Sequence, residues 1–343
     1  MIKRVLLPQP IEDEAVALLK QEGLEVVLSP DKKPETVAAM LKGIQAVVLR
    51  TGIVFTRELM VQADQLRVIS RTGAGVDNVD LEAATERGIL VTCVPDANTY
   101  SVVEQALALM LALMKQLPRM DREVRRDNFD IRYKNLPSDL RGKTLGIVGL
   151  GRIGSELAKA CHQCFDMRIL GHDPYLTGNV RANYQAWISF CDLEKLFRES
   201  DIISLHVPSS SETRHLISAR ELAWMKSEAF IINTSRGGIV DEEALIRCLK
   251  ERSIAGAGLD VFEKEPLEKN NPLKTLDNVI LTPHSAALTR ECVVRLALGA
   301  ARAVVDFLHG RKPAGTVNPA ALMHPRWREG LSAPQGGNSD ETF

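Results

Sequence analysis

The stretch "TLGIVGLGRIG", Thr144–Gly154, decides the fold, because it joins a short apolar run to a glycine-rich turn. Its glycines, Gly149, Gly151 and Gly154, follow the pattern G-x-G-x-x-G, which is typical of the first strand, turn and helix of a dinucleotide-binding unit. Gly149 permits the tight turn, Gly151 lets backbone N–H groups approach a pyrophosphate, and Gly154 lets helix and strand pack closely. The positive end of the following helix favours the same ligand.

An acidic residue stands where such a unit needs one. Asp173 ends the apolar run "RILGH" and lies 19 residues beyond Gly154. A carboxylate at this position accepts hydrogen bonds from the adenosine ribose hydroxyls and repels a 2′-phosphate. The sequence therefore predicts NAD as the cofactor, in preference to NADP.

The segments that follow the glycine-rich turn alternate between strand-like and helix-like patterns. Six strands are expected from residue 143 onward, at "TLGIVG", "MRILGHD", "DIISLHV", "AFIINTS", "IAGAGLDVF" and "NVILTPH". Strands alternating with helices predict a doubly wound parallel sheet. Before them, a long helix is expected from about Thr99 to Leu117, stopped near Pro118, and then a charged connecting arm with little apolar periodicity, "RMDREVRRDNFDIRYKNL".

The first hundred residues show the same alternation on their own. Strand-like runs are "RVLLP", "LEVVLS", "AVVLR", "RVISR" and "ILVTCV", with an amphipathic stretch between each pair. A second parallel sheet is therefore expected. After it, residues 289–310 read as a closing helix, and residues 331–343, "LSAPQGGNSDETF", have the composition of a disordered tail.

Composition limits the class of protein. The 343 residues are 45% hydrophobic and 25% charged, with a net charge of −1, which suits a globular protein of two domains and gives no support for a nucleic-acid partner. The apolar run Val102–Met114 is too short to span a bilayer. Pro8 and Pro10 interrupt the N-terminal region where an export signal would need an apolar stretch. We expect a cytoplasmic protein with no membrane partner.

The six cysteines give one suggestive spacing, "CHQC" from Cys161 to Cys164. A metal site or a redox pair would explain it, but no second Cys-x-x-Cys motif accompanies it, and the surrounding residues read as a helix. We interpret the two thiols as small helical side chains and assign no metal.

Polar residues follow three later strands, at the edge of a parallel sheet where ligands bind. Arg236 comes directly after "FIINTS", Glu265 lies in "LDVFEKEP", and His284 follows "NVILTP". Each alone has an ordinary interpretation as a turn, surface or capped residue. Together at one edge, a guanidinium, a carboxylate and an imidazole indicate a catalytic site.

The chain resembles the D-isomer-specific 2-hydroxyacid dehydrogenases over nearly its whole length. The resemblance rests on motifs in order: "RTGAGVDNVD" (71–80), "ANTYSVVEQALALML" (97–111), "GKTLGIVGLGRIG" (142–154), "LHVPSSSETRHLI" (205–217), "NTSRGGIVDEEAL" (233–245), "AGLDVFEKEP" (257–266) and "LTPHSAA" (281–287). It implies a Rossmann NAD-binding domain, 99–287, inserted into a flavodoxin-like substrate-binding domain formed by 1–98 and 288–343. It also implies that Arg236, Glu265 and His284 are the catalytic residues.

The chemistry of these residues agrees with that assignment. Reduction of a 2-keto acid needs a hydride from the nicotinamide, a proton for the new alkoxide, and a cation for the carboxylate and carbonyl. Arg236 is expected to supply the cation through two parallel N–H bonds. His284 is expected to supply the proton, with Glu265 orienting its ring and raising its pKa. In the oxidative direction His284 acts as the base.

Further contacts are implied by the resemblance. Asp260 is expected at the nicotinamide end of the cofactor, and the other cofactor contacts are Arg152, Ile153, Thr234 and Ser235. The turn Gly73–Val76 is expected to offer backbone N–H groups to the substrate carboxylate, although a plain strand-to-helix turn is the alternative; the substrate contacts in this segment are Gly73, Ala74, Gly75 and Val76.

The particular acid and the physiological direction stay open. Arg50, after "AVVL", either meets a substrate phosphate, which would suit 3-phosphoglycerate, or is a residue at a strand end. The chain ends soon after "GTVNP", so we expect no additional regulatory domain, and hydroxypyruvate or glyoxylate reduction is equally compatible. The alternative from another class is a nucleotide-sensing corepressor, a binding protein that shares this fold. The family also implies a homodimer. Because the charged arm has too little apolar content to fold by itself, we expect it to lie in the interface.

Overall fold

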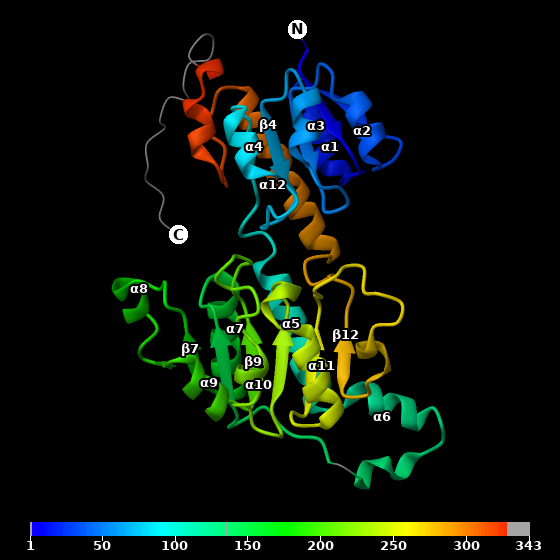
Figure 1. The fold of residues 1–343 in the computed structure, drawn as a ribbon, viewed down its shortest axis with the longest axis vertical. Coiled ribbons are helices and arrows are strands. Elements are labelled where there is room, and N and C mark those ends of the chain that lie inside the picture. The colour runs from blue at the N-terminus through cyan, green and yellow to red at the C-terminus, as the bar shows by residue number, and fades with distance from the viewer. Residues whose placement is uncertain (1, 135, 328–343) are drawn as a thin grey trace. The chain divides into compact units, whose positions relative to one another are not determined.

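The computed structural model of the protein describes residues 2–134 and 136–327, so the expected C-terminal tail lies outside the described residues. The chain divides into two compact units. One is continuous, Thr99–Ala287, and the other combines Met1–Asn98 with the segment that begins at Leu288. Figure 1 labels several elements of each unit.

The first unit is a five-stranded parallel sheet with helices on both faces. Its strand order is β2-β1-β3-β4-β5, the doubly wound arrangement that the sequence predicts. The strands are β1 Arg4–Leu7, β2 Glu25–Leu28, β3 Ala46–Leu49, β4 Val68–Arg71 and β5 Leu90–Thr92. The helices are α1 Asp13–Gln21, α2 Pro34–Met40, α3 Arg57–Gln62, α4 Leu81–Glu86 and α12 Arg290–Leu308, followed by two short 3-10 turns, Pro319–Met323 and Pro325–Trp327.

The two faces of this sheet are covered from different parts of the chain. One core contains side chains of α2, α3 and α4, which follow the strands they cover. The other contains side chains of α1 and of α12, the orange helix that lies against β4 in Figure 1. Alternate residues of β1 serve each face: Leu6 belongs to the first core, and Val5 and Leu7 to the second. The far end of the chain is thus part of the interior of the first unit.

The second unit is a seven-stranded parallel sheet in the order β12-β11-β10-β9-β6-β7-β8. This is the Rossmann arrangement, in which the order reverses beside the first strand, β6. The strands are β6 Thr144–Val148, β7 Arg168–His172, β8 Ile188–Phe190, β9 Ile202–Leu205, β10 Phe230–Asn233, β11 Gly256–Leu259 and β12 Val279–Leu281. The helices are α5 Thr99–Met114, α6 Leu117–Val124, α7 Arg152–Phe165, α8 Gly178–Ala182, α9 Leu193–Glu199, α10 Ala219–Leu222 and α11 Glu242–Glu251, with 3-10 turns at Phe129–Tyr133, Gly237–Ile239 and Pro272–Thr275.

Two sequence expectations for this unit are wrong in detail. The sheet has seven strands rather than six, because the segment Ile188–Phe190 forms an additional edge strand beside β7. An edge strand of three residues is too short for its apolar residues to show a period, so the sequence does not predict it. The long helix ends at Met114 rather than Leu117, and Pro118 lies in the first turn of α6 instead of stopping a helix. Proline suits that position because the first N–H groups of a helix need no partner within it.

The sequence "CHQC" lies in α7, as expected, with Cys161 buried and Cys164 exposed. Burial raises the pKa of the Cys161 thiol to about 12, so this thiol is unreactive near neutral pH. No helix among the described residues is long and apolar enough to cross a membrane.

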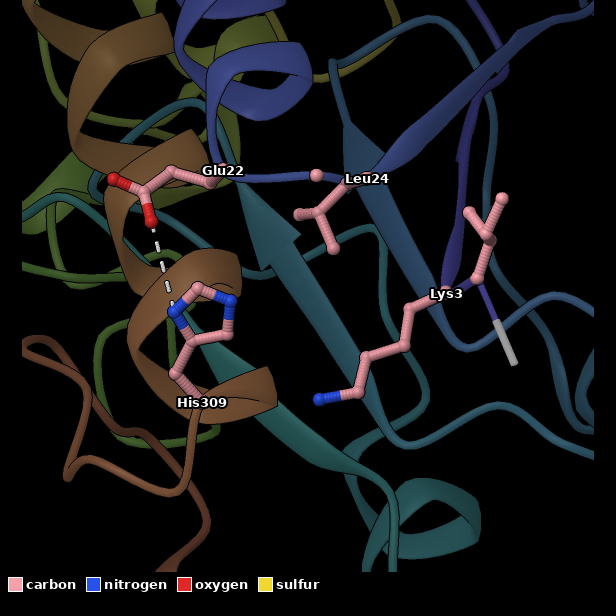
Figure 2. Close-up of a pocket in the computed structure, with 6 residues that line it drawn as sticks. Lys3, Glu22, Leu24 and His309 are labelled. Carbon is pink, nitrogen blue, oxygen red and sulfur yellow. Dashed lines mark ion pairs between the residues drawn. The ribbon is translucent and has the colours of Figure 1, made fainter.

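A pocket of about 430 Å³ lies at the amino ends of β1 and β2 in the first unit. Its polar groups are already engaged: Lys3 Nζ donates to the carbonyl of Leu308, and Glu22 lies 3.6 Å from His309 (Figure 2). Ligands of parallel sheets bind at the carboxyl ends of the strands, the opposite edge. This pocket is therefore not the candidate functional site.

Candidate active site

The glycine-rich turn follows β6 with the tight geometry that its sequence predicts. Gly149 has φ +91°, and a Cβ there would lie 2.8 Å from the carbonyl group of His206. A Cβ on Gly154 would lie 2.0 Å from the carbonyl oxygen of Gly149, so any larger residue would separate α7 from the turn. The space beside Gly151 is open to at least 4 Å. Two glycines are thus required by packing, and the third faces open space.

The surroundings of this turn suit a dinucleotide. Helix α7 begins at Arg152, directly after Gly151, and its first N–H groups and its dipole favour a phosphate group there. The carboxylate of Asp173, after β7, is turned toward the same place: its Oδ2 accepts the Leu150 N–H at 2.9 Å and its Oδ1 accepts the Tyr175 N–H at 3.0 Å. Arg152, Ile153 and Asp173 would therefore lie beside the pyrophosphate and ribose of a bound cofactor.

Residues 234–236 leave β10 in a turn organised by Asn233, which is buried. The Asn233 Oδ1 accepts bonds from the N–H and the hydroxyl of Ser235, at 3.0 and 2.8 Å, and its Nδ2 donates to the carbonyl of Arg236 at 2.9 Å. The buried hydroxyl of Thr234 has no hydrogen-bond partner among the described residues. An unsatisfied buried hydroxyl costs about 1–3 kcal/mol, so this atom is a reasonable place for a ligand contact.

Arg236 extends from this turn and donates a bond from Nη1 to the carbonyl of Ser235 at 2.8 Å. The glycines after it have different surroundings. A Cβ on Gly237 would lie 1.9 Å from the backbone carbonyl of Phe262, whereas Gly238 has open space. The turn that carries Arg236 is therefore in direct contact with the loop that follows β11, and only glycine fits at that contact.

Glu265 and His284 meet, as the sequence analysis predicts. Glu265 belongs to the loop after β11, and His284 follows β12; the His284 Nδ1 lies 2.7 Å from the Glu265 Oε2. Both side chains are partly accessible, 42% for His284 and 35% for Glu265. Partial burial alone would raise the pKa of Glu265, but hydrogen bonds from His284 and the Phe262 N–H, and the charge of Arg236, hold that pKa below its usual value.

The backbone of His284 is held in an unusual conformation by Asp260. His284 has φ +52°, in the left-handed region that non-glycine residues seldom adopt. Its N–H donates to the carbonyl of Asp260 at 2.7 Å. The carboxylate of Asp260 is fully buried and accepts the hydroxyl of Thr282 and the N–H groups of Ser285 and Ala286, at 2.5, 2.9 and 2.9 Å. Asp260 thus organises the turn around His284, and its expected cofactor contact stays a prediction.

A second histidine at this edge, His206 after β9, is a poor proton donor. Its Nε2 lies 2.8 Å from the Ser204 hydroxyl, and burial lowers the pKa of His206 to about 4. His206 is therefore neutral near neutral pH. The sheet order places His284, Glu265 and Arg236 after three neighbouring strands, β12, β11 and β10, and the glycine turn and Asp173 after β6 and β7.

The first unit has its own polar groups at the carboxyl edge of its sheet. The turn Gly73–Val76 follows β4, and the carbonyl of Gly73 accepts the Val94 N–H at 2.9 Å. Arg50 follows β3, and its Nη1 lies 3.2 Å from both the Glu12 Oε1 and the Pro10 carbonyl. The negative charge of Glu12 offsets the positive charge of Arg50 that a substrate phosphate would meet. The role of these residues stays a prediction.

Comparisons with known proteins identify the family. Residues 107–286 match the profile of "D-isomer specific 2-hydroxyacid dehydrogenase, NAD binding domain". The chain belongs to this family. It is 40% identical over 315 residues to D-3-phosphoglycerate dehydrogenase of Archaeoglobus fulgidus, covering 92% of this chain and 59% of that protein. It is 39% identical over 324 residues to glyoxylate reductase of Aeropyrum pernix, covering 92% and 96%.

Solved structures of the D-2-hydroxyacid dehydrogenase family share the fold. D-lactate dehydrogenase of Aquifex aeolicus, complexed with NAD and lactic acid, superposes with a TM-score of 0.79 at 31% identity, over 90% of this chain and 96% of that one. This likeness and the family profile support a nicotinamide dinucleotide as the cofactor. The chain spans 59% of the length of the phosphoglycerate dehydrogenases that it matches first.

Two polar residues that organise the carboxyl edges of the two sheets were not predicted from the sequence. Asn233 orders the Arg236 turn, and its only signal is a polar residue at the end of a buried apolar strand. Arg71 ends β4 with 7% of its surface exposed, and its Nε donates to Asn78 Oδ1 at 2.8 Å beside the Gly73 turn. An arginine directly after "VIS" and two residues before the first glycine of "GAG" was the available signal.

Proposed function

We propose that this chain is an NAD-dependent D-2-hydroxyacid dehydrogenase that also reduces the corresponding 2-keto acids. The hydrogen bond of 2.7 Å between His284 and Glu265, at the carboxyl edge of the NAD-binding sheet, is the observation that carries the proposal. A carboxylate bonded to Nδ1 fixes the tautomer of the ring and leaves Nε2 as the atom that exchanges a proton with substrate. The family of the chain supports the same reaction class.

Each catalytic residue has a separate task in this proposal. When NADH is bound, its nicotinamide supplies the hydride for C2 of the keto acid. Protonated His284 gives its Nε2 proton to the oxygen of C2. Before this transfer, the Glu265 carboxylate stabilises the imidazolium. Arg236 offers a planar pair of N–H groups to the substrate carboxylate and the polarised carbonyl. In the reverse direction neutral His284 accepts the proton of the alcohol.

For the cofactor, we propose NAD rather than NADP. The carboxylate of Asp173 bonds to the turn that would hold the pyrophosphate, and a 2′-phosphate placed there would meet a negative charge. Gly149, Gly151, Arg152, Ile153 and Gly154 then bind the pyrophosphate, and Thr234, Ser235 and Asp260 lie toward the nicotinamide.

The substrate is a small 2-hydroxy or 2-keto acid, of the 3-phosphoglycerate, glycerate/hydroxypyruvate or glyoxylate type. We propose that backbone N–H groups of Gly73–Val76 bind its carboxylate. Arg50 would bind a phosphate only if it exchanged its contact with Glu12 for the substrate. Arg50 and the Gly73–Val76 turn are suited to substrate binding because parallel sheets bind ligands at the carboxyl ends of their strands.

The test is a substrate panel with the purified full chain. NADH oxidation is followed with glyoxylate, hydroxypyruvate, pyruvate and phosphohydroxypyruvate, and each reaction is repeated with NADPH. We expect turnover of at least one keto acid, with NADH strongly preferred. NADH binding without turnover of any of the four would contradict the enzyme and favour a nucleotide-sensing binding protein.

We also propose a cytoplasmic homodimer, with the segment of α6 and the following 3-10 turn in the interface. Four large apolar side chains of this segment are at least half exposed: Leu117, Val124, Phe129 and Tyr133. Exposed apolar groups so close together favour a protein partner.

A further inference from the structure

His215 lies in the loop between β9 and α10 and has an unusual backbone. Its φ is +49°, in the left-handed region that costs a non-glycine residue about 1 kcal/mol or more. Such a conformation persists only where the surroundings hold it in place. The bonds of His215 show what those surroundings are.

The backbone of His215 is attached to the turn that carries Arg236. The His215 N–H donates to the carbonyl of Gly238 at 2.8 Å. The pairing continues along the chain, because the Ile217 N–H donates to the carbonyl of Ile239 at 3.0 Å and the Asp241 N–H donates to the carbonyl of Ile217 at 2.9 Å. The segment that begins at His215 is therefore paired with the residues directly after Arg236.

The side chain of His215 is attached to a different catalytic loop. Its Nε2 donates to the Oε1 of Glu263 at 2.7 Å, and Glu263 stands two residues before Glu265. Both side chains are about one-third exposed, 38% for His215 and 34% for Glu263. A charge-assisted bond of this length is stronger than a neutral one.

The same loop is bonded to the start of α11. The Glu263 N–H donates to the Oε2 of Glu242 at 3.1 Å, and the Glu242 N–H donates to the Oε1 of Glu263 at 3.2 Å. The Glu263 Oε1 that accepts the Glu242 N–H is also the atom that lies 2.7 Å from the His215 Nε2. The ring of His215 is therefore bonded to the same oxygen that links this loop to α11.

We propose that His215 is a positioning residue that fixes the Arg236 turn and the Glu265 loop relative to each other. The inference rests on the proposed function, since it assigns to His215 the geometry of two groups that act on the same substrate. His215 joins those groups through two different parts of one residue, the backbone N–H to one turn and the ring to the other. Arg236 and Glu265 are close enough for the charge of Arg236 to lower the Glu265 pKa, so small shifts between their loops change the site.

The decisive variant is His215→Gly in the full chain. Glycine adopts a positive φ without strain, so the bond to Gly238 is kept and only the ring is removed. We expect kcat/KM for the keto acid to fall by about 10-fold to 10²-fold, as for a small misplacement of reacting groups, mostly through kcat. The Kd for NADH should stay within about twofold of the parent value, because His215 lies outside the glycine-rich turn.

A second variant and a control separate the ring from general effects. His215→Gln places an amide N–H where Nε2 stands and should recover most of the lost kcat/KM. Arg252→Gly is the matched control, because Arg252 also has a positive φ, +53°, and pairs with Asp277 at 2.6 Å, but at the far end of α11. It should keep the parent kcat/KM.

A measurement without substrate keeps this inference distinct from the proposed function. Amide hydrogen exchange in 236–241 and 262–266 should be faster in His215→Gly than in the parent, and unchanged there in Arg252→Gly. A parent enzyme that turns over no keto acid would defeat the proposed function while this exchange experiment still tests His215. Unchanged exchange in both segments, or an equal loss of activity in Arg252→Gly, would overturn the inference.

Discussion

Arg236 is the residue whose geometry depends most on its neighbours. Asn233 orders its turn, Gly237 brings that turn against the Phe262 carbonyl, and Ser235 accepts one of its bonds. These contacts fix the turn from which the guanidinium extends. The planar guanidinium suits a ligand with a carboxylate beside a carbonyl. A residue with the same charge and a different shape is the sharpest test of this description.

We expect Arg236→Lys to lower kcat/KM for the keto acid by about 10-fold to 10⁴-fold, because a lysine replaces two parallel charge-assisted bonds with a point charge. NADH affinity should stay near the parent value. Steady-state kinetics and fluorescence titration with NADH measure the two quantities. Retention of kcat/KM within about threefold would make Arg236 an ordinary turn residue.

The Glu265 carboxyl has a pKa below its usual value in the folded protein, so it is ionised through the neutral range. Its contribution to stability is present above the pKa of the unfolded chain and is lost as the pH falls through the lower folded pKa. At pH values above the folded-state pKa of Glu265, its carboxylate can stabilise a protonated His284.

Glu265→Gln should therefore remove the negative charge that stabilises the imidazolium form of His284, and the rate of reduction should begin to fall at a lower pH than in the parent. The pH dependence of kcat/KM measures this. Parent and variant profiles that coincide would separate the two residues and contradict the pair. The variant also removes a charged acceptor of the Phe262 N–H, so its thermal unfolding is compared at the same pH values.

At the scale of elements, the candidate site lies at the carboxyl edge of the second sheet, where neighbouring turns are in contact with one another. The turn after β10 touches the loop after β11 at Gly237, and Asp260 binds the turn after β12. Neighbouring strands thus share their support, so a clash at one turn is expected to move the next.

The pair Gly237→Ala and Gly238→Ala tests this coupling. A Cβ on Gly237 would stand 1.9 Å from the Phe262 carbonyl, so Gly237→Ala should lower the free energy of unfolding by about 1–3 kcal/mol or more and reduce kcat/KM. Gly238 has open space, and Gly238→Ala should change stability by no more than about 0.5 kcal/mol. Equal effects of the two variants in chemical denaturation would refute the contact.

The sequence predicts those elements that have a strong local signal. The glycine turn, Asp173 after β7, all five strands of the first sheet and α12 are confirmed because apolar period and turn residues agree there. Edge strand β8 is missed because three residues carry no period, and α6 because a proline both stops and starts helices.

The candidate site divides in the same way. Motifs and strand ends point to Arg236, Glu265 and His284, and the structure brings the last two into contact. The orienting roles of His215 and Asp260 carry no such signal, although the sequence points to Asp260 as a cofactor contact. His215 and Asp260 act through bonds between residues 22 to 48 positions apart in the chain, and no local sequence pattern predicts a histidine in the left-handed conformation.

At the scale of the whole molecule, the exposed apolar side chains of α6 and the following turn are the feature to test. Arg132 lies 4.6 Å from the ring centres of both Phe129 and Tyr133, which keeps the two rings presented together. Proteins seldom leave such a group uncovered without a partner.

Sedimentation at micromolar concentration should therefore give twice the chain mass of 37.8 kDa. Replacing Phe129 and Tyr133 with Glu should shift the protein toward the monomer, because charges are disfavoured in an apolar interface. Val61→Glu, at a comparably exposed apolar residue of α3, is the control and should leave the mass unchanged. A monomeric parent would refute the proposal.

The cover that α12 gives the first sheet also has a consequence for biosynthesis. Val5, Leu7, Val48 and Val68 share a core with Ala300 and Val304 of this helix, so their face of the sheet cannot close until α12 has left the ribosome. About 190 residues of the second unit are made in between, which takes roughly 10 to 40 s at ordinary elongation rates. The second unit is continuous and can fold in that interval. The nascent N-terminal segment meanwhile presents an open apolar face, so the speed of translation bears on how much of this protein a cell recovers in active form.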